Sequence, residues 1–160
     1  MAKTASDQQQ WSPARRRPGS TTLRVLGVDF GFARIGLAVG ESSHHISSSR
    51  PNIAAGGKLD ADVQAIVKLA QAEECEAIVV GIPYEEDGSE GRMARICLDL
   101  ASRIAAQGWK VATVSEQGST HAAEKNLRQQ KELKASQRRK LRDGEAARLI
   151  VERFFDEEGL

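Results

Sequence analysis

The pattern of apolar and polar positions predicts that ordered structure begins near residue 23 and opens with a hairpin. The run RVLGVDF over residues 24–30 is almost continuously apolar, which is typical of a short buried strand. Gly31 marks a turn, and ARIGLAVG over residues 33–40 predicts a second strand that pairs with the first. A third extended segment is expected within the serine-rich residues 44–53.

The middle of the chain alternates between helical and strand patterns. Apolar residues recur at helical spacing over residues 60–75 and predict a helix. The continuous apolar run EAIVVGI, residues 76–82, is typical of a strand covered on both faces. A second helix is expected over residues 91–107, and a further strand over residues 109–116.

The C-terminal part predicts two more helices. One is expected to start with Ser119 or Thr120 as its N-cap. The last is expected over residues 141–155, where Asp143 shares a face with small and apolar residues. Together the elements predict an α/β fold on a five-stranded mixed central sheet, with its first three strands antiparallel and helices flanking it.

Composition is that of one globular domain. The chain has 160 residues, of which 40% are apolar and 28% charged, and these values argue against disorder over most of its length. No apolar stretch approaches the roughly 20 residues of a membrane-spanning helix, so no membrane partner is expected. Residues 1–22 are polar and lack periodicity, which predicts a disordered basic tail before a single domain over residues 23–158.

The two cysteines indicate a reducing environment. Cys75 and Cys97 lie far apart, outside any metal-ligand spacing and in apolar helical contexts, so buried, reduced thiols are expected. Because no secretory signal is present, we expect a cytoplasmic location. The arginine-containing tail loosely resembles an organellar transit peptide, which leaves a mitochondrial or plastid location as the alternative.

Charge is distributed unevenly behind the net value of +1. Residues 1–24 carry five basic residues and one acidic residue, and residues 124–142 carry eight basic and two acidic residues. The rest of the chain therefore has a net charge of −9. Basic blocks on an otherwise acidic protein indicate a local contact with a polyanion, with a solvated, flexible loop as the alternative.

Three carboxylates stand at positions that suggest chemistry. Asp29 is the penultimate residue of an apolar strand, Glu116 ends another strand, and Asp143 lies in the first turn of the last helix. If the strands of Asp29 and Glu116 lie side by side, the acids converge where hard oxygen ligands suit Mg²⁺ or Mn²⁺. Two such ions could activate water and stabilise the leaving oxygen of a phosphodiester. Each acid also has a purely structural explanation: a hairpin anchor, an exposed strand end, or a favourable charge near a helix N-terminus.

Two sequence blocks carry a resemblance to a known family. LRVLGVDFGFARIGLAVG resembles the opening of the YqgF/RuvX proteins, in which a strand is followed by Asp-aromatic-Gly and then Arg-Ile-Gly. IVVGIPYEEDGSEG is similar to the second block of the family, and the similarity covers about residues 23–158. This resemblance implies an RNase H-like fold and metal-dependent phosphodiester hydrolysis on structured RNA or branched DNA.

The resemblance also assigns catalytic and metal-binding roles to the three acids. Asp29 matches the first catalytic Asp of the family, Glu116 the Glu of its Asp-Glu-Arg motif, and Asp143 the late Asp ahead of an Ala-Ala pair. The motif around Glu116 reads Ser-Glu-Gln here, and Glu85 stands where the family has Asn. These departures leave the metal ligands in place but bring substrate binding and rate into question.

Several basic residues are candidates for binding nucleic acid. Arg34 matches the early arginine of the family, and either a phosphate contact or an ion pair with a core acid fits it. Four more cations immediately precede Asp143, where a nucleic-acid backbone must run if that residue binds metal. They are Arg138, Arg139, Lys140 and Arg142.

The block Asp-Gly-Ser-Glu-Gly over residues 87–91 has two explanations. Its backbone N–H groups could lie near a phosphate at the start of the following helix, or Ser89 could simply cap that helix, which we favour. Aromatic residues are few, and Trp109 and Phe154 have the character of packing residues. Stacking of single-stranded bases therefore has little support, and a structured substrate read by its shape fits better.

The leading function is a metal-dependent endonuclease, most simply one that processes the 5′ end of pre-16S rRNA, with a Holliday-junction resolvase as the DNA alternative. A ribosome-assembly factor that binds nucleic acid without turnover is the second hypothesis. A nucleotide-binding half like those of actin and the sugar kinases is the third, disfavoured because no second Asp-x-Gly loop follows Gly31. The expected partner is pre-rRNA or branched DNA, and the ribosome is a further candidate partner. Both a monomer and a homodimer fit these expectations.

Overall fold

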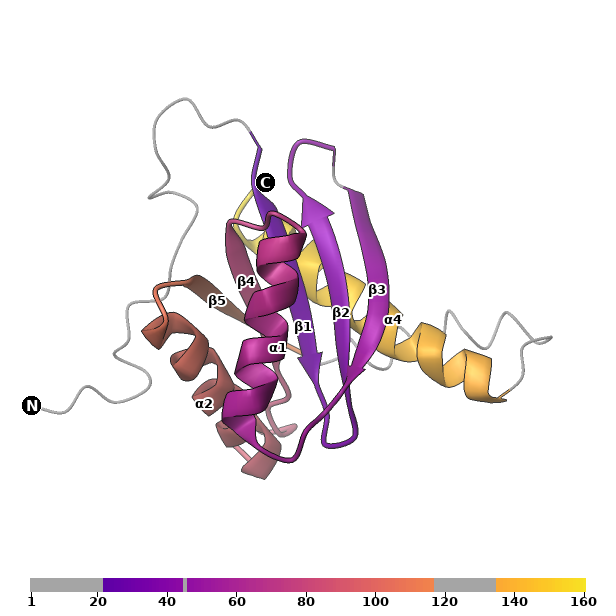
Figure 1. The fold of residues 1–160 in the computed structure, drawn as a ribbon, viewed down its shortest axis with the longest axis vertical. Helices are drawn as coiled ribbons and strands as arrows, with labels where there is room; N and C mark the ends of the chain where they lie inside the picture. Colours follow the sequence, from indigo (N-terminus) through magenta and orange to yellow (C-terminus); the bar gives the residue numbers. More distant parts are fainter. Residues whose placement is uncertain (1–21, 45, 117–134) are drawn as a thin grey trace, which may run out of the picture.

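The computed structural model describes residues 22–44, 46–116 and 135–160, and it places residues 135–143 as backbone only. A five-stranded sheet forms the centre of the molecule, in the order β3-β2-β1-β4-β5 (Figure 1). Its strands are β1 (Arg24–Phe30), β2 (Arg34–Glu41), β3 (Ile46–Ala54), β4 (Ala77–Ile82) and β5 (Lys110–Ser115). The helices of the described part are α1 (Leu59–Ala72), α2 (Arg92–Ala106) and α4 (Ala135–Glu157).

The sheet is mixed, as the sequence predicted. Strands β1, β2 and β3 are antiparallel neighbours, whereas β1, β4 and β5 run parallel to one another. The expected α/β fold, with its first three strands antiparallel, is therefore confirmed. Because parallel strands end at the same edge of a sheet, the carboxyl ends of β1, β4 and β5 lie together, and in open α/β sheets this edge is where ligands bind.

Helices cover both faces of the sheet. Helices α1 and α2 lie on one face and α4 crosses the other (Figure 1). Along β1, Leu26 and Val28 point into the cluster under α1 and α2, and Val25 points into the cluster under α4. Side chains alternate between the two faces of a strand, so Asp29 stands on the α4 face, two positions beyond Gly27.

Close contact between α4 and the sheet depends on a glycine. A Cβ atom at Gly27 would lie 2.5 Å from Cγ2 of Val151 and 2.8 Å from the carbonyl oxygen of Ala147. The helix therefore packs directly on the backbone of β1. This contact therefore determines where the preceding turns of α4 lie relative to the carboxyl end of β1.

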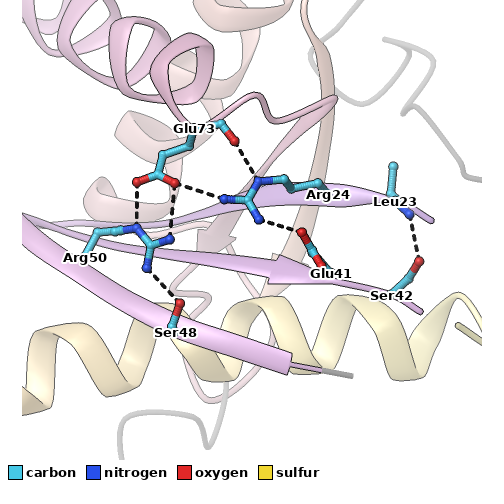
Figure 2. Close-up of polar contacts among 7 residues, drawn as sticks. All are labelled: Leu23, Arg24, Glu41, Ser42, Ser48, Arg50 and Glu73. Atoms are coloured by element: carbon cyan, nitrogen blue, oxygen red, sulfur yellow. Dashed lines mark hydrogen bonds and ion pairs between the residues drawn. The ribbon is translucent and has the colours of Figure 1, made fainter. Parts of the chain in front are cut away.

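A network of ion pairs lies at the opposite end of the sheet (Figure 2). Glu73, just after α1, accepts hydrogen bonds from Arg24 Nη2 at 3.0 Å and from Arg50 Nε at 2.6 Å. Arg24 also donates from Nη1 to Oε1 of Glu41 at 2.7 Å. We call these residues the Glu73 network. It ties the end of α1 to β1, β2 and β3.

The last helix begins earlier than the sequence predicted. Helix α4 starts at Ala135 rather than near residue 141, so the basic residues ahead of Asp143 belong to its first turns. Those turns lack an apolar stripe, and periodicity therefore gave no sign of the helix there. The helix expected from Ser119 or Thr120 and nearly all of the predicted basic tail lie outside the described residues. Within the described part, no helix is both long and apolar enough to cross a membrane.

Candidate active site

Two of the three predicted acids meet at the carboxyl end of the parallel strands. Asp29 is the penultimate residue of β1, and Glu116 immediately follows β5. Their side chains are joined by a hydrogen bond. The backbone N–H of Glu116 donates to the carbonyl oxygen of Ile82 at 2.9 Å, which fixes the start of this side chain beside β4. We call these two residues the Asp29–Glu116 pair.

Adjacent strands, the condition under which the sequence predicted that the acids converge, are not what brings them together, because β4 runs between β1 and β5. The pair meets across Gly81, a residue of β4 that has no side chain. A Cβ atom at Gly81 would lie 2.7 Å from both Cγ and Oε1 of Glu116, and 2.5 Å from Cδ1 of Ile150. The side chain of Glu116 therefore lies over the backbone of β4, in the space that this glycine leaves open.

Sequence reasoning missed Gly81 as part of the site. The one available signal was a glycine inside the otherwise apolar run of residues 76–82, a position that weakens a strand and often marks a close approach. Nothing in that run indicated which side chain would approach. The answer required the strand order, which places β4 between β1 and β5.

The two acids of the pair are partly buried and lie against each other, which shifts the pKa of Glu116. Burial raises the pKa of Glu116 well above its ordinary range, and the hydrogen bond with Asp29 and the negative charge of Asp29 raise it further. Two neighbouring carboxyl groups do not both ionise readily without a compensating charge. Such a pair holds a proton between its members or binds a cation, and carboxylate oxygens are the ligands that Mg²⁺ and Mn²⁺ prefer.

Asp143 belongs to α4, one turn before Ala147 and two turns before Ile150. Both of those residues are buried, with the Ala147 carbonyl over Gly27 and the Ile150 side chain over Gly81. The helical stripe that contains Asp143 thus passes over β1 and β4. The side chain of Asp143 lies outside the described residues, so its role as a third ligand stays a prediction. Among the described side chains, no three potential ligands gather.

The predicted nucleic-acid-binding cations are placed only in part. Arg34 is the first residue of β2 and its side chain is exposed at the same end of the sheet as Asp29. Its contact with phosphate remains a prediction. The other four are residues of α4 whose side chains lie outside the described part, and the same holds for them. They are Arg138, Arg139, Lys140 and Arg142.

The loop before α2 differs from the prediction. The N-cap of α2 is Gly91 and no side chain caps it, so the predicted cap at Ser89 is wrong. The N–H of Ser89 instead donates to Oδ1 of Asp87 at 2.9 Å, within the loop. A Cβ atom at Gly91 would collide with the carboxylate of Glu85. This carboxylate lies against the start of α2, where a negative charge is favourable. The same helix start is the place where the sequence offered a phosphate contact as an alternative.

An exposed aromatic residue near the site was also missed. Phe32, in the turn between β1 and β2, is 62% exposed, and Cζ of Arg92 lies 5.9 Å from the centre of its ring. Trp109 and Phe154, the aromatics that we did consider, pack against or within the core as predicted. The signal for Phe32 was its position directly after the turn residue Gly31.

Both cysteines are buried and free, as predicted. Burial raises the pKa of Cys75 to about 11 and that of Cys97 to about 12. The negative charges of Glu116 and Asp29 add to the second shift. A thiol with such a pKa stays protonated at neutral pH, so neither cysteine carries the thiolate needed for nucleophilic chemistry.

Comparisons with known proteins identify the family of this chain. A family model described as "RuvX: Holliday junction resolvase" matches residues 23–157. A protein of Anaeromyxobacter dehalogenans named "Putative pre-16S rRNA nuclease" is 36% identical over 135 residues, which cover 84% of this chain and 97% of that protein. A protein of Thiobacillus denitrificans with the same name is 31% identical over 132 residues, covering 82% and 90% of the two chains.

Solved structures show a shared fold. The RuvC protein of Thermus thermophilus matches with a TM-score of 0.53 at 14% identity, over 86% of this chain and 97% of its own. The same protein in complex with a Holliday junction substrate gives 0.52 at 16% identity, over 86% and 96% of the two chains. The predicted RNase H-like fold is thereby confirmed. With a matching family model over residues 23–157 and relatives above 30% identity, this chain belongs to the RuvX family.

Proposed function

We propose that this protein is a metal-dependent endonuclease that hydrolyses phosphodiester bonds of structured nucleic acid. The observation that carries the proposal is the Asp29–Glu116 pair, because two hydrogen-bonded acids at the carboxyl edge of a sheet need a strong reason to persist. Binding of divalent metal supplies that reason, since a cation removes the repulsion between the two acids. Membership in a family of nucleases supports the same conclusion.

The residues of this chain have separate tasks in that reaction. Asp29 and Glu116 hold the metal, with Asp143 as the expected third ligand. A bound divalent ion lowers the pKa of water and offsets charge on the phosphate in the transition state. Gly81 leaves the space that the side chain of Glu116 occupies, and Ile150 lies over the same glycine, so both limit how far this carboxylate can move.

The basic residues attract the substrate backbone. Arg34 and the cations in the first turns of α4 are the proposed phosphate contacts, and they supply affinity that weakens with salt. Such contacts position a nucleic acid without reading its sequence. Recognition then rests on the shape of a folded substrate, which agrees with either a ribosomal RNA precursor or a branched DNA.

We favour pre-16S rRNA as the substrate, because the relatives that cover nearly the whole domain carry that RNA in their names, and within it we propose the 5′ end. A four-way DNA junction is the second candidate, favoured by the description of the family model. Symmetric cleavage of a junction requires a two-fold dimer, whereas trimming of an RNA end does not. Mapping of the cleavage products on both substrates therefore separates the two candidates.

The central test uses purified wild type, Asp29→Asn and Glu116→Gln with Mg²⁺ or Mn²⁺. Each substitution should lower the cleavage rate by about a thousandfold, equivalent to the several kcal/mol that metal ions contribute to such transition states. Glu73→Gln is the matched control, since it also removes a carboxylate but at the other end of the sheet. If wild type binds both substrates tightly and cuts neither, the protein is a binding factor and the enzymatic proposal is wrong.

A further inference from the structure

Two large apolar side chains are strongly exposed among the described residues, and they lie at opposite ends of the sheet. Ile46 is 61% exposed at the start of β3, paired with Glu41 and therefore near the Glu73 network. Phe32 is 62% exposed in the turn that follows β1, three residues after Asp29. Only the second position is close to the candidate active site.

The turn that carries Phe32 is firmly held. The N–H of Gly31 donates to the carbonyl oxygen of Arg34 at 3.0 Å, and the N–H of Ala55 donates to the carbonyl oxygen of Ala33 at 3.0 Å. These bonds fix the residues on both sides of Phe32. The ring is therefore presented to solvent by a defined turn.

Arg92 holds the ring without burying it. It is the first residue of α2, is itself exposed, and places its guanidinium carbon 5.9 Å from the ring centre, within the range of a cation–π contact. Since the guanidinium can cover only one face and Phe32 remains 62% exposed, the opposite face is accessible. An aromatic face with a guanidinium behind it is suited to receiving a flat, electron-rich ring.

We propose that Phe32 and Arg92 form a platform on which one unpaired base of the substrate stacks beside the cleaved phosphate. The inference rests on the proposed nuclease function and deepens it, because it requires a structured substrate with an unpaired nucleotide at the cleavage position. Three residues of chain span at most about 11 Å, so the platform lies within reach of a nucleotide next to the Asp29–Glu116 pair.

The charge around the ring favours nucleic acid over an apolar protein partner. Arg34 and Arg92 are both exposed on the elements that flank Phe32. Arginine beside an aromatic ring suits a base together with its phosphate, whereas an apolar protein surface would have to cover these charges. Phe32 also revises our expectation from composition, which left base stacking with little support.

The test measures binding in EDTA, so that it does not depend on cleavage. The probes are an RNA hairpin with a short single-stranded 5′ extension carrying 2-aminopurine, the same hairpin with its extension paired, and a four-way DNA junction carrying 2-aminopurine at the crossover. Stacking of the base on an aromatic ring quenches its fluorescence. Wild type should quench the unpaired probe, and the paired hairpin should show no such signal.

Phe32→Ala should weaken binding of the unpaired probe by about 5- to 100-fold and abolish the quenching, while binding of the paired hairpin stays unchanged. Phe32→Leu should behave like Phe32→Ala, since it keeps an apolar side chain but no ring, and Phe32→Trp should restore both signals. Ile46→Ala is the matched control for removal of an exposed apolar side chain, and it should bind all probes like wild type.

Two results overturn the platform. The first is that Phe32→Ala binds the unpaired probe and quenches its fluorescence as wild type does. The second is that Phe32→Ala loses self-association in sedimentation but binds the unpaired probe unchanged, which would make Phe32 part of a protein interface. Failure of the nuclease proposal looks different. Wild type would then show Phe32-dependent quenching but cut no substrate, so the platform would stand and catalysis would not.

Discussion

The pKa of a glutamate is shifted in opposite directions at the two ends of the central sheet. At one end Glu73 lies between Arg24 and Arg50, and hydrogen bonds from these two arginines, that from Arg50 above all, lower its pKa (Figure 2). At the other end Glu116 lies against a second acid, Asp29, and burial together with that neighbour raises its pKa. The residue type is the same, and burial together with the neighbours reverses the direction of the pKa shift.

This difference separates a structural role from a functional one. A carboxylate held by two guanidinium groups stabilises the fold and needs nothing further. A carboxylate held against another carboxylate opposes folding near neutral pH, and proteins keep such unfavourable arrangements mainly at functional sites. We therefore propose that the Asp29–Glu116 pair is kept for its chemistry and at a cost in stability.

Gly81→Ala should have the largest effect at the end of the sheet that carries Asp29 and Glu116. The added methyl group would displace Glu116 and Ile150, which it would meet at 2.7 and 2.5 Å. We expect the cleavage rate to fall by about 100-fold, the penalty for a catalytic group misplaced by about 1 Å. We also expect the free energy of unfolding to fall by about 1–3 kcal/mol through overpacking.

Gly40→Ala is the control for Gly81→Ala. A Cβ atom at Gly40 would also collide with α4, through Val151, but Gly40 pairs with Val25 near the other end of the sheet. Urea denaturation should show a similar loss of stability, and the cleavage assay should show activity close to wild type. Equal losses of activity in both variants would mean that Gly81 acts only through packing.

Glu116→Gln should stabilise the protein in the absence of metal. Because the pKa of Glu116 is raised in the folded state, its stabilising contribution exists at low pH and is lost as the pH rises through neutrality toward about 10. Replacement by a neutral amide removes that loss. At neutral pH in EDTA we expect a gain of roughly 1–3 kcal/mol in urea denaturation, shrinking to nothing near pH 4. A variant less stable than wild type at every pH would contradict this account.

Glu73→Gln should show the reverse pH dependence with a smaller effect. The lowered pKa of Glu73 means that its contribution is present above the ordinary pKa of a glutamate and is lost as the pH falls. We expect a loss of about 1 kcal/mol at neutral pH, because this ion-pair network is partly exposed to solvent. The same denaturation series measures it, and a marked loss of cleavage would show that the two ends are not independent.

Local sequence pattern predicted most of the elements. The expected bounds of β1 are those observed, because a continuous apolar run ends sharply at Gly31. The other described strands lie within a few residues of their predicted positions for similar reasons. The start of α4 was missed, since a polar helix projecting from the domain carries no apolar stripe.

The site was predictable only as far as each residue could be judged alone. Asp29 and Glu116 attracted attention as acids at the ends of apolar strands, and the resemblance to a known family assigned their roles. The parts that depend on other elements were not predictable: Gly81 lies under Glu116 because of the order of the strands, and the exposure of Phe32 is a result of how the elements pack. The cap expected at Ser89 failed because α2 begins only at Arg92, with Gly91 as its N-cap.

The most direct measurement of the central claim is thermal unfolding during titration with Mn²⁺ or Mg²⁺. A ligand that binds only the folded state raises Tm with its concentration. We predict this rise for wild type and for Glu73→Gln, and its absence for Asp29→Asn and Glu116→Gln. An equal rise in all four proteins would show that the Asp29–Glu116 pair does not bind the metal.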